Sequence, residues 1–222
     1  MQRVGVGWLA WDLTHSTAWL GAVAAADLAP MLLLVPVAGA ITDRHNPLKQ
    51  MKLSLLMLFL QALTLAVLQF GGWLSIEILV LLSLWSGCVY PFQQTARHSV
   101  LAGVVTREEF APAIGVDSAL FHSTRFVGPS LAGVIIPIMG VGGTFVAHSV
   151  GCLWFIVGLF TMRMPDPERK QRARRSLLGD MRDGFVFVRL HAGIYPLFIM
   201  LTVVCICLRP MQEMYPAFAG GV

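Results

Sequence analysis

Charged residues are scarce in this sequence of 222 residues. Asp, Glu, Lys and Arg together make up 13% of it, apolar residues make up 56%, and the mean hydropathy is +0.72. Water-soluble proteins are about 25% charged, so about half that supply cannot cover a surface that faces water. A soluble globular fold is therefore excluded, and lipid is the predicted solvent.

Several signals of chemistry are also missing. The four cysteines lie inside apolar runs without Cys-x-x-Cys spacing or a nearby His pair, so neither a disulfide framework nor a metal site is expected. No Gly-rich phosphate-binding loop of the P-loop type occurs, and no Ser, His and Asp residues have the spacing of a catalytic set. The sequence thus predicts no enzyme and no cofactor.

The net charge of +4 does not indicate a nucleic-acid partner. The basic residues fall into short loops between long apolar runs, whereas a nucleic-acid-binding surface gathers them on one polar face. The expected partners are instead a lipid bilayer and a small-molecule substrate.

Long apolar runs predict an all-α polytopic membrane protein. Each crossing of the hydrocarbon core needs about 20 residues in a helix, because no backbone amide can stay unpaired in lipid. Crossings are expected at residues 18–41, 53–70, 74–95, 112–138, 144–162 and 194–208. Residues 4–11 are apolar but too few to cross, and they suggest the end of a helix whose beginning is absent.

The distribution of Lys and Arg supports this layout. Of the 16 basic residues, thirteen fall in loops on one side of the membrane: Arg44, Lys49, Lys52, Arg97, Arg107, Arg163, Arg169, Lys170, Arg172, Arg174, Arg175, Arg182 and Arg189. The positive-inside rule assigns that side to the cytoplasm, and hence the chain to the plasma (inner) membrane. The basic run at 169–175 favours a topology and anionic-lipid anchor over a regulatory site.

Three stretches resemble major facilitator transporters. Residues 39–49, GAITDRHNPLK, are similar to the G-x-x-x-D-R-x-x-R-R/K signature between helices two and three of that family, with Gly39, Asp43, Arg44 and Lys49 at the signature positions. Residues 128–133, GPSLAG, are similar to the G-P-x-x-G-G element of antiporter-type members. The stretches 7–16, 95–97, 106–109 and 117–129 resemble the branch that holds macrolide-efflux and enterobactin-exporter proteins.

The resemblance implies a twelve-helix transporter built from two six-helix bundles. Residues 1–163 would form the N-terminal bundle, with a partial helix one and helices two to six. Residues 164–191 would form a cytoplasmic basic linker with an interfacial helix at 176–190, and residues 192–222 helix seven and the start of an outer loop. The rest of the C-terminal bundle would be a missing partner.

The implied function is secondary active export of small amphiphilic or drug-like molecules by alternating access. Two alternatives stay open: a truncated fragment without independent transport activity, and a non-transporting membrane scaffold. Ser83 stands where many proton-coupled drug antiporters carry an Arg, so the resemblance does not imply proton coupling. A proton remains only a candidate coupling ion.

Ionisable residues inside spans mark a candidate substrate or ion pathway. Each costs about 2.5 to 3.5 kcal/mol at mid-helix, so each needs a partner or a function. Asp27 lies in the span at 18–41, where it could bind a cation or a proton, or serve a structural pairing.

One face of the span at 112–138 holds the other candidates. Ser118, His122, Arg125 and Pro129 follow i, i+4, i+7, i+11 spacing, and this face is expected to look inward. Arg125 is expected to pair with Asp27, or to act structurally beside the Gly-Pro kink. His122 could titrate near neutral pH, although a structural hydrogen bond is the commoner role.

A helix pivot is expected beside that face. Gly128, Pro129 and Gly133 combine a broken backbone hydrogen bond with residues small enough for close packing. The alternative is the ordinary enrichment of Gly and Pro in membrane helices.

Overall fold

The computed structural model describes residues 1–106 and 108–162, with a few isolated positions between 186 and 203. The chain divides into two compact units, Met1–Pro167 and Glu168–Val222, and the helices described below all belong to the first. The predicted basic linker with its interfacial helix, the span at 194–208 and the outer loop lie outside the continuously described residues.

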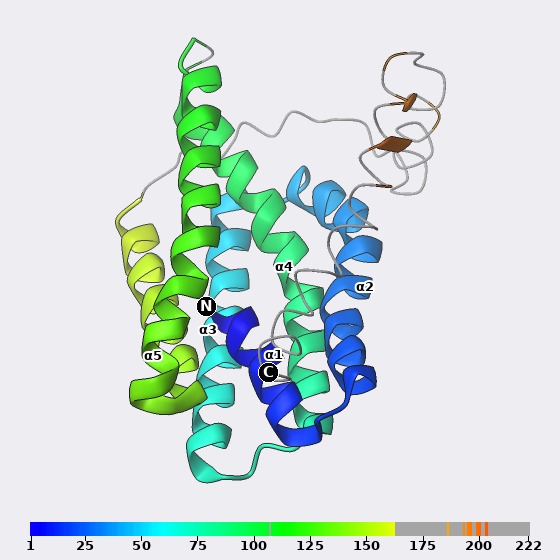
Figure 1. Cartoon of the computed structure of the whole chain (residues 1–222). Helices are drawn as coiled ribbons and strands as arrows, with labels where there is room; N and C mark the ends of the chain where they lie inside the picture. Colours follow the sequence, from blue (N-terminus) through cyan, green and yellow to red (C-terminus); the bar gives the residue numbers. More distant parts are fainter. Residues whose placement is uncertain are drawn as a thin grey trace. The chain divides into compact units, whose positions relative to one another are not determined.

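Five helices make up the first unit: α1 (Gln2–Thr14), α2 (Thr17–Thr42), α3 (Pro47–Gly71), α4 (Ile76–Val104) and α5 (Phe110–Thr161) (Figure 1). The described residues contain no strand, which confirms the all-α class. Four of the helices, α2 to α5, are long and apolar enough to cross a membrane. At 13 residues, α1 is about 20 Å long and is too short to cross.

Helix α5 is two crossings rather than one. Its 52 residues would extend about 78 Å as a straight helix, far beyond a hydrocarbon core of about 30 Å. Gly140 interrupts it with φ 70° and ψ 180°, a conformation that is essentially restricted to glycine. The ribbon reverses direction there (Figure 1), in the gap that the sequence predicts between 138 and 144.

Local chemistry sets the ends of the helices. The Asn46 side chain accepts hydrogen bonds from the backbone N–H groups of Leu48 and Lys49, and Pro47 occupies the first turn of α3. Gly72 ends α3 in the left-handed conformation with φ 72°. Ser75 caps α4 by accepting a hydrogen bond from Ile78.

The packed core joins α3, α4 and the second part of α5. Its buried members are Leu48, Met51, Leu55, Ala96, Val100, Ile156 and Leu159. Large apolar residues elsewhere on the helices are strongly exposed, including Leu32, Phe126 and Trp154. Exposed apolar side chains are expected where the surrounding solvent is lipid. In lipid, van der Waals packing and small interfacial residues hold the helices together.

One expectation about the loops is wrong. Arg97 was expected in a cytoplasmic loop, but α4 continues through it to Val104. The sequence predicts the end of this span at residue 95, two residues before Arg97. The structure shows that the helix keeps its hydrogen bonding through this polar turn, where Arg97 has an acidic partner.

Candidate functional site

An ion pair joins α1 and α2. The Asp27 carboxylate oxygen Oδ2 lies 2.7 Å from Nη2 of Arg3. The side chain of Asp27 is 19% exposed and that of Arg3 is 42% exposed. The pair satisfies both charges where an isolated ion would be expensive, and it leaves the guanidinium partly accessible.

Helix α4 supplies the second side of this site. The Ser86 hydroxyl lies 3.0 Å from Oδ1 of Asp27 and 2.9 Å from the carbonyl oxygen of Ser83, and it can donate to either. The Arg3 guanidinium carbon lies 5.8 Å from the centre of the Tyr90 ring. The Asp27 carboxylate thus has an ion pair with α1 and a hydroxyl neighbour on α4, and the Tyr90 ring of α4 lies beside the guanidinium of the pair.

Gly87 allows α2 and α4 to approach closely beside Asp27. A Cβ atom at Gly87 would lie 2.4 Å from the backbone carbonyl oxygen of Asp27 and 2.9 Å from that of Ala26. Backbone atoms cannot move aside as the end of a flexible side chain can. The absence of a side chain at Gly87 therefore sets the distance across the site.

Asp27 and Ser86 lie well inside their helices, one third or more of the way along them. Asp27 is ten residues from the start of α2 and Ser86 is ten residues from the start of α4, which is about 15 Å in each case. A hydrocarbon core is about 30 Å thick, so these groups lie near its middle.

A second ion pair links α4 to the first half of α5. Arg97 donates to the Asp117 carboxylate through Nε, at 3.1 Å, and through Nη2. The Arg97 guanidinium carbon also lies 5.4 Å from the centre of the Phe121 ring. These two side chains are 24% and 20% exposed.

The expected pair of Asp27 with Arg125 is wrong, because Asp27 bonds to Arg3 and Ser86 instead. Arg125 is exposed, with its guanidinium carbon 4.9 Å from the centre of the Phe121 ring. His122 and Pro129 are also exposed and Ser118 is half-buried. The face of α5 that was expected to look inward is therefore open in the described part of the chain. Helical spacing showed that these residues share a face, but not which way that face points.

The proposed pivot residues lie within continuous helix. Pro129 is an internal residue of α5, and the non-helical backbone of α5 falls at Gly140 instead. A Cβ atom at Gly128 would lie 3.0 Å from the backbone nitrogen of Met1, whereas one at Gly133 would meet no described atom within 4 Å. Of these two glycines, Gly128 is in close contact with another described residue and Gly133 is not.

The signature loop forms the turn between α2 and α3. Asp43 caps α2, with its N–H donating to the carbonyl of Gly39, and its side chain is exposed together with those of Arg44 and Lys49. A Cβ atom at Gly39 would meet no described atom within 4 Å. The loop thus presents its charged residues on the surface of the described bundle.

A polar node that the sequence did not reveal lies beneath this loop. The Gln50 side-chain nitrogen donates to the hydroxyl of Thr42, at 2.7 Å, and to the carbonyl of Phe92, at 3.2 Å. The hydroxyl of Thr42 lies 2.8 Å from that of Thr95. These bonds tie α2, α3 and α4 together at one end of the bundle.

The strongest omission from the sequence prediction is Arg3. Arg3 directly precedes the apolar run at 4–11, which is too short to predict a crossing, so the sequence does not predict it as a residue inside the membrane. Its charge beside that run is the one signal that the sequence offers. Ser86 and Tyr90 carried no such signal, because their role depends on how α4 packs against α1 and α2.

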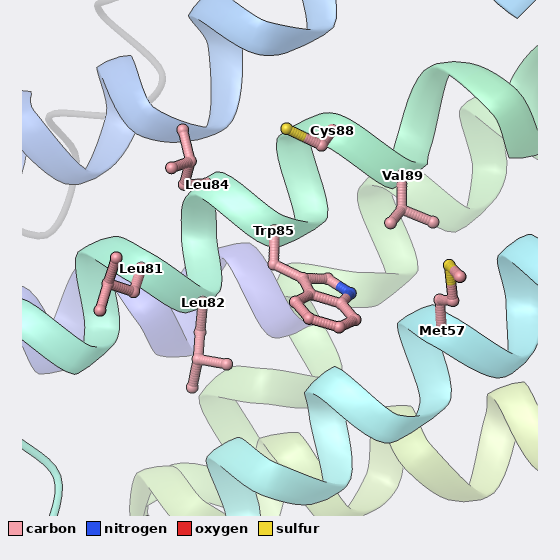
Figure 2. A pocket seen from close by; sticks show the side chains of 7 residues that line it. All are labelled: Met57, Leu81, Leu82, Leu84, Trp85, Cys88 and Val89. Carbon is pink, nitrogen blue, oxygen red and sulfur yellow. The ribbon is translucent and has the colours of Figure 1, made fainter.

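An apolar groove of about 530 Å³ lies on α3 and α4, away from the charged residues (Figure 2). Its lining is Met57, Leu81, Leu82, Leu84, Trp85, Cys88 and Val89. Several of these side chains are strongly exposed, as expected of a surface in contact with lipid. Within the part of the chain that the structure describes, no group of three or more His, Cys, Asp or Glu residues could hold a metal ion.

Comparisons with known proteins agree with this architecture. The chain matches the transmembrane secretion effector family over residues 1–206 and therefore belongs to this family of major facilitator transporters. It is a multi-pass membrane protein of a transporter family.

One curated relative is similar to part of this chain. The chain is 25% identical over 149 residues to the staphyloferrin A transporter of Staphylococcus aureus (strain NCTC 8325 / PS 47). The matched stretch covers 67% of this chain and 38% of that relative, so it spans less than half of the relative's length. No solved structure matches the chain.

Proposed function

We propose that this chain forms part of a secondary active exporter of small amphiphilic molecules in the plasma (inner) membrane. The observation that carries the proposal is the Arg3–Asp27 pair, held near mid-membrane with Ser86 and Tyr90 beside it. Ionisable residues at that depth are energetically costly and therefore rare, and where they occur they mark substrate or ion pathways. This pair offers both a cation and a carboxylate that can exchange partners. Transport energy would come from an ion gradient.

Alternating access requires a second bundle that rocks against this one. The curated relative has a longer chain than the matched stretch, which supports the presence of such a partner in the working transporter. The exposed Asp43, Arg44 and Lys49 are placed at the turn between α2 and α3, where they would latch the cytoplasmic closure against that partner. The basic loops would then face the cytoplasm.

The relative also suggests a substrate. Staphyloferrin A is the molecule named for the Staphylococcus aureus transporter, and it is a first candidate to test with this chain. The partly exposed guanidinium of Arg3 beside an aromatic ring would suit a small polar molecule with an apolar part.

The experiment compares this chain alone with the same chain joined to the C-terminal bundle of the Staphylococcus aureus relative. Efflux of two fluorescent amphiphiles, rhodamine 123 and carboxyfluorescein, is measured in cells, with membrane abundance quantified for both proteins. We expect efflux of at least one dye by the joined protein and none by the chain alone. Absence of efflux and of staphyloferrin A transport by the joined protein, at full abundance, would favour the non-transporting scaffold.

A further inference from the structure

Positive charge exceeds negative charge in the cluster that the two ion pairs form with Arg125. The cluster holds three guanidinium groups, those of Arg3, Arg97 and Arg125, and two carboxylates, those of Asp27 and Asp117. Each carboxylate is bonded to one arginine, Asp27 to Arg3 and Asp117 to Arg97. Arg125 is left without a carboxylate partner among the described residues.

Aromatic rings connect these arginines into one row. Arg97 and Arg125 lie against the same ring, with their guanidinium carbons 5.4 Å and 4.9 Å from the centre of Phe121. Arg3 lies 5.8 Å from the centre of the Tyr90 ring. Tyr90 and Arg97 are seven residues apart on α4, which places them on one face at about 10 Å along the axis.

Arg125 lies too deep to meet a lipid headgroup. It is fifteen residues from Phe110, where α5 begins, and fifteen from Gly140, where the chain turns, which is about 22 Å in each direction. An exposed guanidinium at that depth needs a counter-charge, since ionised groups near the membrane centre are costly. The counter-charge must therefore come from something other than the headgroup layer.

We propose that this row of arginines binds a small organic anion, with Arg125 as the group that engages its carboxylate or sulfonate. The inference rests on the proposed transport function and gives its substrate class: an anion with an apolar part that fits against Phe121 and Tyr90. Arginine suits this task because its planar guanidinium binds a carboxylate through two parallel hydrogen bonds. A cationic amphiphile would instead meet the excess positive charge.

The test uses the full chain in phosphatidylcholine nanodiscs with two dyes that share a xanthene ring system, anionic carboxyfluorescein and cationic rhodamine 123. Binding is measured by fluorescence polarisation in 0.3 M salt, which screens surface charge. We expect carboxyfluorescein to bind at least tenfold more tightly than rhodamine 123. Arg125→Gln should weaken carboxyfluorescein binding about tenfold, and Arg125→Lys should weaken it less.

Lys52→Gln is the matched control. It removes one positive charge whose amine lies 4.7 Å from the centre of the Phe160 ring, away from the row of arginines. We expect it to leave carboxyfluorescein binding unchanged. If Arg125→Gln has no larger effect than Lys52→Gln, or if rhodamine 123 binds as tightly as carboxyfluorescein, the inference is overturned.

A lipid source of the anion is tested by adding phosphatidylglycerol to the nanodiscs. We expect carboxyfluorescein affinity to change less than twofold. Loss of affinity as large as that caused by Arg125→Gln would mean that a headgroup occupies the site, and the small-molecule inference would fail. Efflux of rhodamine 123 but not carboxyfluorescein by the joined protein would also overturn the anion inference while leaving the exporter proposal intact.

Discussion

Asp27 of α2 and Arg3 of α1 form an ion pair at 2.7 Å, and the hydroxyl of Ser86 on α4 lies 3.0 Å from the other oxygen of the same carboxylate. This arrangement couples three helices through one charged group. Any movement of α1 against α2 and α4 must therefore change what the carboxylate and the guanidinium contact. That property is what a transporter needs at the point where its helices rearrange.

Exchanging the two charges separates the structural role of this pair from its functional role. Asp27→Ala leaves Arg3 without its carboxylate, and we expect a loss of about 1–2 kcal/mol of stability, less than for a fully buried pair because both groups are partly exposed. The double variant Arg3→Asp with Asp27→Arg should recover most of this loss. Thermal unfolding in detergent, followed by fluorescence-detected size exclusion, measures both.

Recovery of stability without recovery of transport would show that the position of the carboxylate matters. If the double variant were as unstable as Asp27→Ala, the pair would not be the source of the stability.

The close approach at Gly87 makes that residue intolerant of substitution. A Cβ atom there would lie 2.4 Å from a backbone oxygen, so Gly87→Ala should push α4 away from α2 and cost about 1–3 kcal/mol. Gly21→Ala is the control, because no atom of the described residues lies within 4 Å of a Cβ at that position in α2. Equal melting temperatures for the two variants would contradict the packing described here.

Much of the fold could be predicted from the sequence, because apolar run length responds directly to bilayer thickness. The break between 138 and 144 was visible as a gap in the apolar runs, and Gly140 lies within it. The end of α4 could not be predicted, because a charged residue such as Arg97 is typical of a loop. Its ion pair with Asp117 of α5, which the sequence does not show, allows Arg97 to lie within the helix. Composition cannot reveal a partner that lies on another helix.

The candidate site was predictable only in part. Asp27 stood out because a carboxylate in a span needs an explanation, but its partner could not be chosen from spacing within one helix. Arg125 was the tempting choice because it lies mid-span, yet the packing of α1 brings Arg3 to Asp27 instead. The rotation of each helix about its axis decides which residues face each other. The sequence specifies that rotation only through the whole set of packing contacts.

The turn within α5 depends on the positive φ of Gly140. Alanine at φ 70° and ψ 180° is strained by about 1–3 kcal/mol, so Gly140→Ala should lower the melting temperature or shift the position of the turn. Gly151→Ala is the matched substitution, because Gly151 lies within regular helix and no described atom lies within 4 Å of a Cβ there. A Gly140→Ala protein as stable as Gly151→Ala would show that the turn has another origin.

Glu109 predicts a pH-dependent stability of the segment that leads into α5. Hydrogen bonds from the hydroxyl and the backbone N–H of Thr106 lower the pKa of Glu109 below its ordinary value of 4.5. A lowered pKa means that the ionised form is favoured in the folded protein. This contribution is therefore full above about pH 4.5 and is lost as the pH falls through the lowered value.

Hydrogen exchange of the Thr106 amide, corrected for intrinsic rates, checks this expectation. Protection should fall between pH 5 and about pH 3 in the native chain and should be low at both values in Glu109→Gln. Glu108→Gln, which removes the neighbouring charge, should behave as the native chain does. A native-like pH dependence in Glu109→Gln would assign the effect to another group.

The most direct test of the account is the transport rate of Asp27→Asn, measured per molecule in the protein joined to a C-terminal bundle. Asn keeps the shape of the side chain and its bond to Ser86 but removes the charge that holds Arg3. Asp12→Asn, on an exposed residue near the end of α1, is the control. We expect at least a tenfold loss of transport in Asp27→Asn and none in Asp12→Asn. Transport by Asp27→Asn at the native rate and abundance would contradict a pathway through the Arg3–Asp27 pair.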